Sequence, residues 1–173
     1  ILLNGKEIDR EIQIMSISVN KEVNRIPTAS ILIRDGDAGL EDFEISNTAA
    51  LIPGNSLKIK AGRDGNNTTI FEGVIIKQSL KVREDGNTYL KVEAKDNAFK
   101  MTLGRKNKYY KDKTDKQVAE SILGNYGLKG KIAETKGVHK ELVQNYVSDW
   151  DYLVCRAEVN GQLVFVNDGK IDI

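Results

Sequence analysis

The chain is poor in the residues that mark several common classes of protein. It has one cysteine, Cys155, so no disulfide forms within it, which is typical of assembly in a reducing compartment. No apolar run approaches the roughly 18 residues of a membrane-spanning helix, so we expect no stable membrane insertion. The 26 Lys and Arg residues nearly balance the 25 Asp and Glu residues, so the charge of the chain as a whole does not point to nucleic acid. A globular protein of one or two domains remains, because 173 residues with 40% hydrophobic content suffice for a core.

The sequence also lacks the common signatures of catalysis. It contains no Walker sequence, dinucleotide fingerprint, HExxH or GxSxG. The single histidine, His139, has no Ser, Cys or carboxylate at a recognisable spacing, although histidine catalysis needs a reacting partner and an orienting group. We therefore expect a surface or edge histidine. Cys155 also lacks a suitable partner and is predicted to be a small, half-buried thiol. These absences predict no enzyme activity, no catalytic residues and no cofactor.

Two Asp-Gly turns resemble calcium-binding loops only at first sight. Residues 35–37 and 64–67 begin with the right residue types, but the glycine required at the sixth position is Leu40 in the first and Thr69 in the second. In the second segment the glutamate required at the twelfth position is replaced by Ile75. We predict two turns and no metal site.

Residues 1–100 predict a curled antiparallel sheet. Apolar residues alternate with polar ones at period two, with Gly and Asp-Gly between the runs. In the first long strand, Ile12 and Ile14 share one phase and Ile17 and Val19 the other, which predicts a bulge near residues 15–16. The apolar faces of the next four strands are Ala29, Ile31 and Ile33; Leu57, Ile59 and Ala61; Val74, Ile76, Leu80 and Val82; and Leu90, Val92 and Ala94.

Turn residues complete this picture of the first hundred residues. Asp64-Gly65 and Asp85-Gly86 predict hairpin turns, and Gly73 inside a long strand predicts a corner. Bends and hairpins together favour a barrel-like sheet. Residues 36–55 have few strand signals and are predicted to form a long loop, with an exposed apolar series. Leu40, Phe43 and Ile45 make up this series, and one hypothesis is that it contacts a partner.

From about residue 101 the pattern becomes helical. Thr114 and Gln117 form a capping box, and Gly127 ends the predicted helix. Its inward face is Val118, Ala119, Ile122, Leu123 and Tyr126. Short strands are predicted at 130–133, 162–166 and 171–173. The whole is therefore mainly β, α+β overall: an antiparallel β-barrel-like domain at 1–100 and a small α+β domain at 101–173.

The stretch QNYVSDWDYLVCRAEVNG, residues 144–161, predicts a packing helix. Ser148 stands where an N-cap belongs, Asp151 can reach back toward the cap amide, and Gly161 supplies a stop signal. One apolar stripe contains Trp150, Leu153, Val154 and Ala157, and the opposite side carries Asp149, Tyr152, Arg156 and Glu158.

The run GRKNKYYKDK, residues 104–113, has two interpretations. Its five Lys and Arg residues alternate with Tyr109 and Tyr110, which could pair phosphate contacts with base stacking. Because the net charge of the chain is nearly zero and the run lies between the sheet and a helix, a solvated connector is favoured over a nucleic-acid site.

Three stretches together resemble one family. They are VNKEVNRIPTASILIRDGD (19–37), LGRKNKYY (103–110) and QNYVSDWDYLVCRAEVNGQLVF (144–165). They are similar to the N-terminal region of the Vgr-type spike proteins of type VI secretion, relatives of the late control D proteins and baseplate hubs of contractile phages. In the last stretch the resemblance covers Tyr146, Ser148, Asp149, Trp150, Asp151, Glu158 and Gly161. The family's second barrel and C-terminal spike do not occur in these 173 residues, and the ending VNDGKIDI, which reads as a hairpin cut in mid-sheet, predicts a fragment.

The resemblance implies a structural hub segment in a trimeric spike protein of a contractile injection machine, which connects an inner tube to the spike. The implied partners are two further copies in the full-length protein, a hexameric inner-tube protein, and spike, tip or effector proteins. The implied location is assembly in the bacterial cytoplasm, followed by secretion or ejection. No partner-binding residue is implied. The alternatives are a free-standing β-rich module that binds sugars or peptides and, least favoured, an enzyme that uses Cys155.

Overall fold

Contacts between residues divide the chain into two compact units. The computed structural model describes residues 1–9, 11–36, 42–82 and 87–173. The first unit, called the sheet unit here, contains Ile1–Asn20 and Pro27–Asp96. The second, the α+β unit, contains Lys21–Ile26 and Asn97–Ile173. The sequence placed its division between residues 100 and 101 and assigned no part of residues 21–26 to the second domain.

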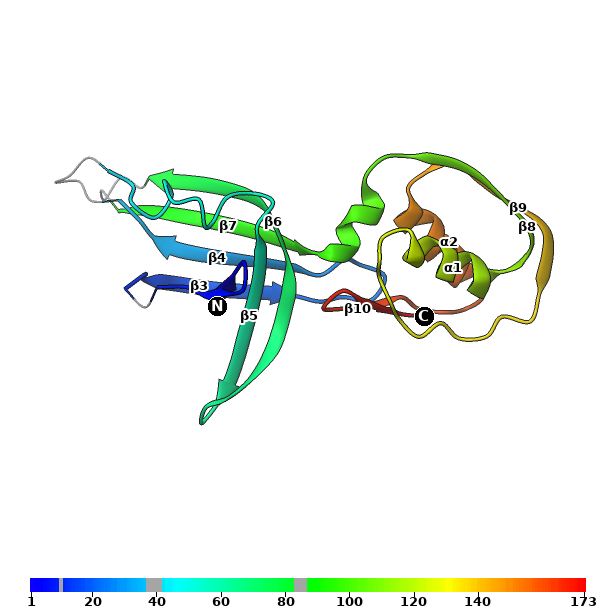
Figure 1. Ribbon diagram of the computed structural model, residues 1–173, viewed down its shortest axis with the longest axis horizontal. Helices are drawn as coiled ribbons and strands as arrows, with labels where there is room; N and C mark the ends of the chain where they lie inside the picture. The colour runs from blue at the N-terminus through cyan, green and yellow to red at the C-terminus, as the bar shows by residue number, and fades with distance from the viewer. Residues whose placement is uncertain (10, 37–41, 83–86) are drawn as a thin grey trace. The chain divides into compact units, whose positions relative to one another are not determined.

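The sheet unit is built on one antiparallel sheet (Figure 1). Its strands are β1 (Leu2–Leu3), β2 (Lys6–Glu7), β3 (Ile14–Asn20), β4 (Thr28–Arg34), β5 (Ser56–Arg63), β6 (Asn66–Val82) and β7 (Thr88–Asp96). The seven strands lie in the order β2-β1-β5-β6-β7-β4-β3. The mainly β, antiparallel prediction is confirmed, but the sheet is open: among the described strands it ends at β2 and β3 and does not close into a barrel.

The core of the sheet unit lies on one face of this sheet. Its buried residues are Leu3, Ala29, Ile31, Ile33, Leu51, Leu57, Ile59, Phe71, Ile75, Leu90, Val92 and Ala94. The predicted faces of β4 and β7 are confirmed, whereas Ala61 of β5 is exposed. In β6 the predicted phase was wrong before the register shift between Ile75 and Lys77, where Phe71 and Ile75 are buried instead of Val74 and Ile76, because one extra residue reverses the faces of a strand. After the shift Leu80 lies opposite the buried Leu90, on the predicted face, although Leu80 and Val82 are 42% and 70% exposed.

The long strand β6 joins two parts of the sheet by bending. Its first half pairs with β5, its second half pairs with β7, and Gly73 belongs to both ladders, opposite Leu57 and Asp96. Figure 1 shows β6 curving along its length. A Cβ atom on Gly73 would lie 2.2 Å from the carbonyl oxygen of Lys95. The predicted corner is therefore a place where the neighbouring backbone approaches too closely for any side chain.

Local turn signals were good guides within the sheet unit. The β3–β4 register shifts between Ile14 and Ser16, which confirms the predicted bulge. Asp64 and Gly65 have φ angles of 54° and 83° between the paired residues of a two-residue hairpin, as predicted. Asp85 and Gly86 lie outside the described residues, as does Leu40 of the predicted exposed series. Phe43 and Ile45 are only partly buried, and Ile45 packs against the core.

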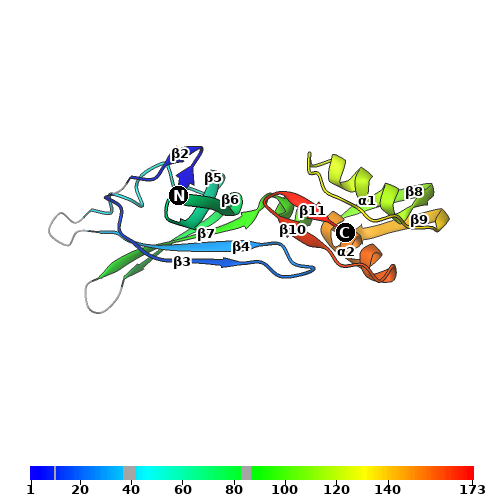
Figure 2. The same ribbon diagram turned by 90° about the horizontal axis from the view of Figure 1, so that it is seen from below.

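The α+β unit contains two separate two-stranded ladders and two helices (Figure 2). Its elements are the 3-10 helix η1 (Asn97–Thr102), β8 (Lys106–Thr114), α1 (Asp115–Gly124), β9 (Val138–Val147), α2 (Asp149–Val159), β10 (Phe165–Asn167) and β11 (Lys170–Asp172). β8 pairs with β9, and β10 pairs with β11 in the predicted C-terminal hairpin. The expected connector at 104–113 is therefore mostly the strand β8. The expected strand at 130–133 is absent from the described structure, which has only a bridge between Lys129 and Lys170 there.

The two helices follow their predicted signals closely. The capping box of α1 is present, and Ser148 caps α2 by accepting a hydrogen bond from the Asp151 amide at 3.1 Å. The Asp151 carboxylate accepts from the Ser148 hydroxyl instead of the cap amide. The residues predicted to face inward are buried or partly buried: Val118, Ala119, Ile122 and Leu123 of α1, Tyr126 in the turn after α1, and Trp150, Leu153, Val154 and Ala157 of α2.

Three residues of α2 depart from the prediction. Asp149 and Tyr152, placed on the outward side, are both buried, and the Tyr152 ring stacks on Tyr110 of β8 with centroids 6.0 Å apart. Cys155, expected to be half-buried, is exposed. The buried surface of α2 is thus wider than its apolar stripe, because polar residues are also packed inside.

Glycine substitutions test the corner in β6. Gly73→Ala is expected to lower the free energy of unfolding by about 1–3 kcal/mol, because the new methyl group overlaps the Lys95 carbonyl. Gly124→Ala is the matched control: its Cβ meets nothing within 4 Å, and helix propensity favours alanine by up to about 1 kcal/mol. Urea unfolding followed by circular dichroism measures both. Equal stability of Gly73→Ala and the unsubstituted chain would contradict the close approach.

Candidate functional site: two polar clusters in the α+β unit

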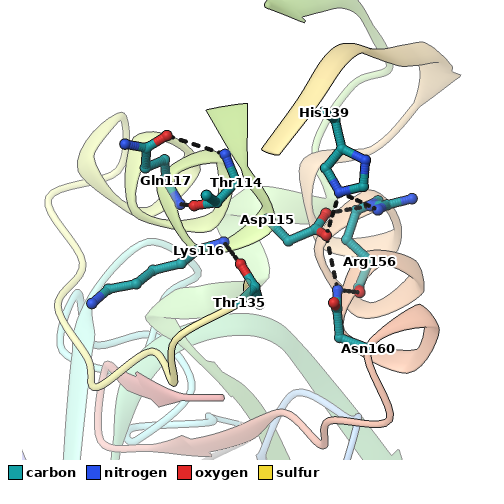
Figure 3. A network of polar contacts seen from close by, with 8 residues as sticks. All are labelled: Thr114, Asp115, Lys116, Gln117, Thr135, His139, Arg156 and Asn160. Carbon is teal, nitrogen blue, oxygen red and sulfur yellow. Dashed lines mark hydrogen bonds and ion pairs between the residues drawn. The ribbon is translucent and has the colours of Figure 1, made fainter. Parts of the chain in front are cut away.

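The first cluster is centred on the carboxylate of Asp115, the first residue of α1. The Nε of Arg156 donates to Oδ1 at 2.6 Å, and the Nδ2 of Asn160 donates to Oδ2 at 3.0 Å. The Nε2 of His139 lies 2.9 Å from Oδ2. Figure 3 shows these side chains converging on Asp115 from β9 and from α2. The cluster ties α1, α2 and β9 together.

Hydrogen bonds at the first turn of α1 fix the position of the Asp115 carboxylate. The Gln117 amide donates to the Thr114 hydroxyl at 3.2 Å, and the Thr114 amide donates to the Gln117 side chain at 3.1 Å. The Lys116 amide donates to the Thr135 hydroxyl at 3.1 Å (Figure 3). The positive end of the helix dipole also favours a negative charge in the first turn. Asp115 is therefore fixed as an anion by its own helix as well as by its partners.

The electrostatics of Asp115 suit an ion pair that stays charged. Burial raises the pKa of its carboxyl, but hydrogen bonds from Arg156, Asn160 and His139 outweigh burial and bring the pKa to about 2. The hydrogen bond to Asp115 in turn raises the pKa of the Arg156 guanidinium. A carboxylate that is ionised at neutral pH and already accepts from several donors is a poor proton shuttle. His139 and Asp115 are in contact, but their arrangement is better suited to holding α1, α2 and β9 together than to transferring a proton.

The second cluster surrounds Asp149, the first residue of α2. Its Oδ2 accepts from Lys106 Nζ at 2.5 Å and from the Tyr126 hydroxyl at 2.7 Å, while its Oδ1 accepts from Gln144 Nε2 at 2.8 Å. Gln144 is fully buried and also accepts from the Tyr110 hydroxyl at 3.3 Å. The cluster joins β8, β9, α2 and the turn that follows α1.

The buried charge of Asp149 is compensated by its neighbours. Burial raises the pKa of its carboxyl, but hydrogen bonds from Lys106, Gln144 and Tyr126 lower this pKa by more than burial raises it. The pKa of Asp149 is therefore below its usual value. The hydrogen bond to Asp149 raises the pKa of Lys106. Burial, helped by the Asp149 charge, raises the pKa of Tyr110 to about 12. At neutral pH the cluster therefore holds one carboxylate and one ammonium with neutral phenols around them.

A third contact brings in the segment before β4. The backbone amide of Asn24 donates to the Val164 carbonyl at 2.9 Å, and the backbone amide of Val164 donates to the Asn24 side-chain oxygen at 2.8 Å. The side-chain nitrogen of Asn24 also donates to the Glu158 carboxylate. Asn24 has a φ of 56°, a conformation that asparagine tolerates better than most residues. Together with the Lys106–Asp149 pair, this contact shows that the three stretches that carry the family resemblance, at 19–37, 103–110 and 144–165, all contribute residues to the α+β unit.

The cavities of the described residues offer little room for a ligand near these clusters. The space beside Asp115 is lined mainly by apolar side chains of α1 and α2 and measures about 10 Å³, roughly the size of one water. A shallower depression of about 290 Å³ in the sheet unit is lined mainly by polar residues of β3, β4 and β7, among them Lys91 and Glu93. Cys155 is exposed. No group of three or more potential metal ligands occurs among the described residues.

One family model matches the whole sequence. Residues 1–173 match the model described as the Alg8 N-terminal domain. The chain belongs to the Alg8 N-terminal domain family. No curated protein matches it. Within the described part of this Alg8 N-terminal domain, neither helix is long and apolar enough to cross a bilayer.

Solved structures show which fold this Alg8 N-terminal domain has. A component of the type VI secretion system from E. coli, the c3393 protein, itself described as structurally similar to the T4 bacteriophage tail proteins gp27 and gp5, matches with a TM-score of 0.68 at 13% identity. The 43 kDa tail protein of prophage MuSo2 from Shewanella oneidensis matches at 0.67 and 10%. A tail protein from Neisseria meningitidis MC58 matches at 0.68 and 15%. The alignments cover 93%, 93% and 98% of this chain but 46%, 53% and 48% of those proteins.

These matches refine the resemblance drawn from the sequence. The chain has the fold of tail proteins from phages and type VI secretion systems, and it spans about half the length of the structures that it matches. The family model is that of the Alg8 N-terminal domain, not that of the Vgr-type proteins named from the three stretches. The broader resemblance to phage-tail-like proteins is therefore confirmed at the level of the fold.

Removal of the Asp115 charge tests the first cluster. Asp115→Asn is expected to destabilise the α+β unit by about 3 kcal/mol, because it leaves the Arg156 guanidinium without its carboxylate. Urea unfolding followed by the fluorescence of Trp150, which lies in this unit, measures the change. His139→Gln is a milder comparison, because Arg156 and Asn160 keep their acceptor.

The pH dependence of stability follows from the same carboxyl. Its folded pKa of about 2 lies below the unfolded value, so its contribution is present above pH 4 and is lost as the pH falls toward 2. The unsubstituted chain should lose about 2 kcal/mol more than Asp115→Asn over this interval. Parallel curves for the two proteins would contradict the depressed pKa.

The two aspartates at the start of α2 provide a matched pair for the second cluster. Asp149→Asn is expected to cost about 3 kcal/mol, because it removes the buried charge to which Lys106, Gln144 and Tyr126 all donate. Asp151→Asn should cost less than about 1 kcal/mol, because Asp151 is exposed and contributes a cap contact. Both lie in the first turn, so a shared helix-dipole effect cannot explain a difference. Equal losses would show that the Asp149 cluster contributes no more than the helix end.

Proposed function

We propose that the chain is a structural hub segment of a spike protein in a contractile injection machine, either a type VI secretion system or a phage-tail-like particle. The observation that carries this proposal is the match over at least 93% of the chain to three tail or secretion-system proteins at TM-scores of 0.67–0.68. A match of this extent at 10–15% identity indicates a shared fold. The step from fold to role is an inference by analogy.

The chemistry of the chain supports a scaffold and not an enzyme. Asp115, His139 and Arg156 are occupied with one another, and the carboxylate of Asp149 is occupied by donors from three sides. Each of these four groups thus helps to hold two or more elements together. We propose no catalytic residue and no cofactor.

In this proposal the full-length protein is a Vgr-type spike protein that forms a homotrimer. It sits between a hexameric inner-tube protein and a C-terminal spike with its tip or effector proteins. It is assembled in the bacterial cytoplasm and then secreted or ejected with the spike. The resemblance of three sequence stretches to the N-terminal region of Vgr-type proteins supports these finer assignments. All three stretches contribute to the framework of the α+β unit.

The mass of the full-length protein in solution tests the proposal. Light scattering on the parent polypeptide, extended past Ile173 through its spike, should give three copies per particle. A clean monomer over a wide range of concentration would remove the central requirement of a hub. The open depression of the sheet unit would then favour a ligand-binding module, and binding of sugars or peptides would become the next measurement.

A further inference from the structure

The strands β8 and β9 form a curved ribbon with two different faces. Among the described strands they pair only with each other, and Figure 1 shows them bending around α1 and α2. On the inner face, Tyr110 and Gln144 are buried. On the outer face, Tyr109 and Val143 stand directly opposite each other and are 65% and 47% exposed. This cross-strand pair lies at the middle of the ribbon and is accessible to another molecule.

A second aromatic group lies near one end of the ribbon. The Arg105 guanidinium carbon is 5.1 Å from the centre of the Tyr146 ring, which is 64% exposed. The Tyr146 amide donates to the Asn107 side chain at 2.7 Å, so the backbone of this residue is fixed by β8. Tyrosine and arginine are the residue types most often found at energetic centres of protein interfaces. Stacking holds these two side chains in place before any partner binds, which reduces the entropy lost on binding.

The charge of this region is strongly positive. Residues 105–113 contain five Lys and Arg residues and one acidic residue, Asp112. Lys106 is neutralised by Asp149, which leaves Arg105, Lys108, Lys111 and Lys113 in the same short segment. The whole α+β unit has 15 Lys and Arg residues against 11 Asp and Glu residues, a formal charge of +4 in a chain of +1. The complementary partner is therefore acidic.

We propose that the outer face of the β8–β9 ribbon is a docking surface for an acidic protein segment that also carries apolar side chains. Tyr109 and Val143 contact the apolar side chains, while Lys111, Lys113 and Arg105 face the carboxylates. This surface rests on the ribbon alone and does not depend on the hub proposal.

The partner covers the face of the ribbon and does not extend its edge. Asp112 in β8 and Tyr146 in β9 both have φ angles of 49°, and the β8–β9 register shifts between Lys106 and Lys108. Irregular backbone and lysine-rich strands discourage the addition of another strand at an edge. The ladder is therefore poorly prepared for edge pairing, whereas the outer side chains remain accessible.

Single-stranded nucleic acid fits this surface less well. Binding of successive bases requires several aromatic rings along a basic groove. Tyr110 is buried and Arg105 covers one face of the Tyr146 ring, so Tyr109 and the other face of Tyr146 are the exposed ring surfaces, too few for a row of stacked bases. Protein is accordingly the favoured partner.

Site-specific photo-crosslinking in the full-length protein tests the proposal. A benzophenone amino acid replaces Tyr109 or Val143 in cells that assemble the protein, and the adducts are identified by mass spectrometry. Val159 and Leu163 are the matched control positions, since both are exposed apolar residues of the same unit. The yield at 109 and 143 is expected to exceed the control yield by about tenfold, with adducts to protein segments in which Asp and Glu outnumber Lys and Arg.

Charge reversal provides the second arm. Lys111→Glu with Lys113→Glu should reduce the crosslink yield at position 109 by about tenfold. Lys129→Glu with Lys131→Glu, two exposed lysines outside the ribbon, should leave it unchanged. Circular dichroism of each purified variant checks that the fold is retained. The proposal is overturned by equal yields at ribbon and control positions, by adducts to nucleic acid or lipid, by adducts to a basic segment, or by equal effects of the two charge reversals. Trimer formation is measured separately, so the hub proposal can fail while this one stands.

Discussion

The buried carboxylate of Asp149 is the constraint on which the α+β unit depends. Its side chain is 2% exposed, and a charge in that position is strongly unfavourable unless it is paired and hydrogen-bonded. The compensation comes from Lys106 of β8, Gln144 of β9 and Tyr126 after α1. All three must be in place together, so the cluster fixes the register of the ribbon against α2. Apolar packing alone would allow more than one arrangement of two short helices and a two-stranded ribbon.

The stretches that carry the family resemblance perform a related task. Lys106 belongs to the second stretch and Asp149 to the third, and Asn24 of the first stretch exchanges backbone and side-chain hydrogen bonds with Val164 of the third. These polar residues satisfy one another inside one unit. They are signatures of how the unit is folded, and this explains why a resemblance built on Tyr, Asp and Trp can identify a fold without identifying a reaction.

Local signals in the sequence predicted local structure well, and failures occurred where a distant residue decides. The Thr114–Gln117 box, the bulge after Ile14 and the Asp64-Gly65 turn each depend on neighbours within a few positions. The phase of β6 failed because its bulge follows from pairing with β7. β8 was missed because its inner side contains Lys106 and Lys108, whose long apolar stems can be buried while their charges find partners. His139 was judged to lack a carboxylate because Asp115 is 24 residues away in sequence and 2.9 Å away in space.

Satisfaction of the inner polar groups also determines what the outside of the ribbon can do. Strand alternation sends every second residue of β8 outward, so inner positions that serve Asp149 leave Tyr109 and Lys111 to the solvent side. The charge of Lys106 is compensated by Asp149, whereas the outward lysines of β8 take no part in this ion pair. Because an apolar pair and an excess of cations remain on one face of a ribbon that is rigidly tied to two helices, the partner that fits must supply apolar side chains and negative charge together.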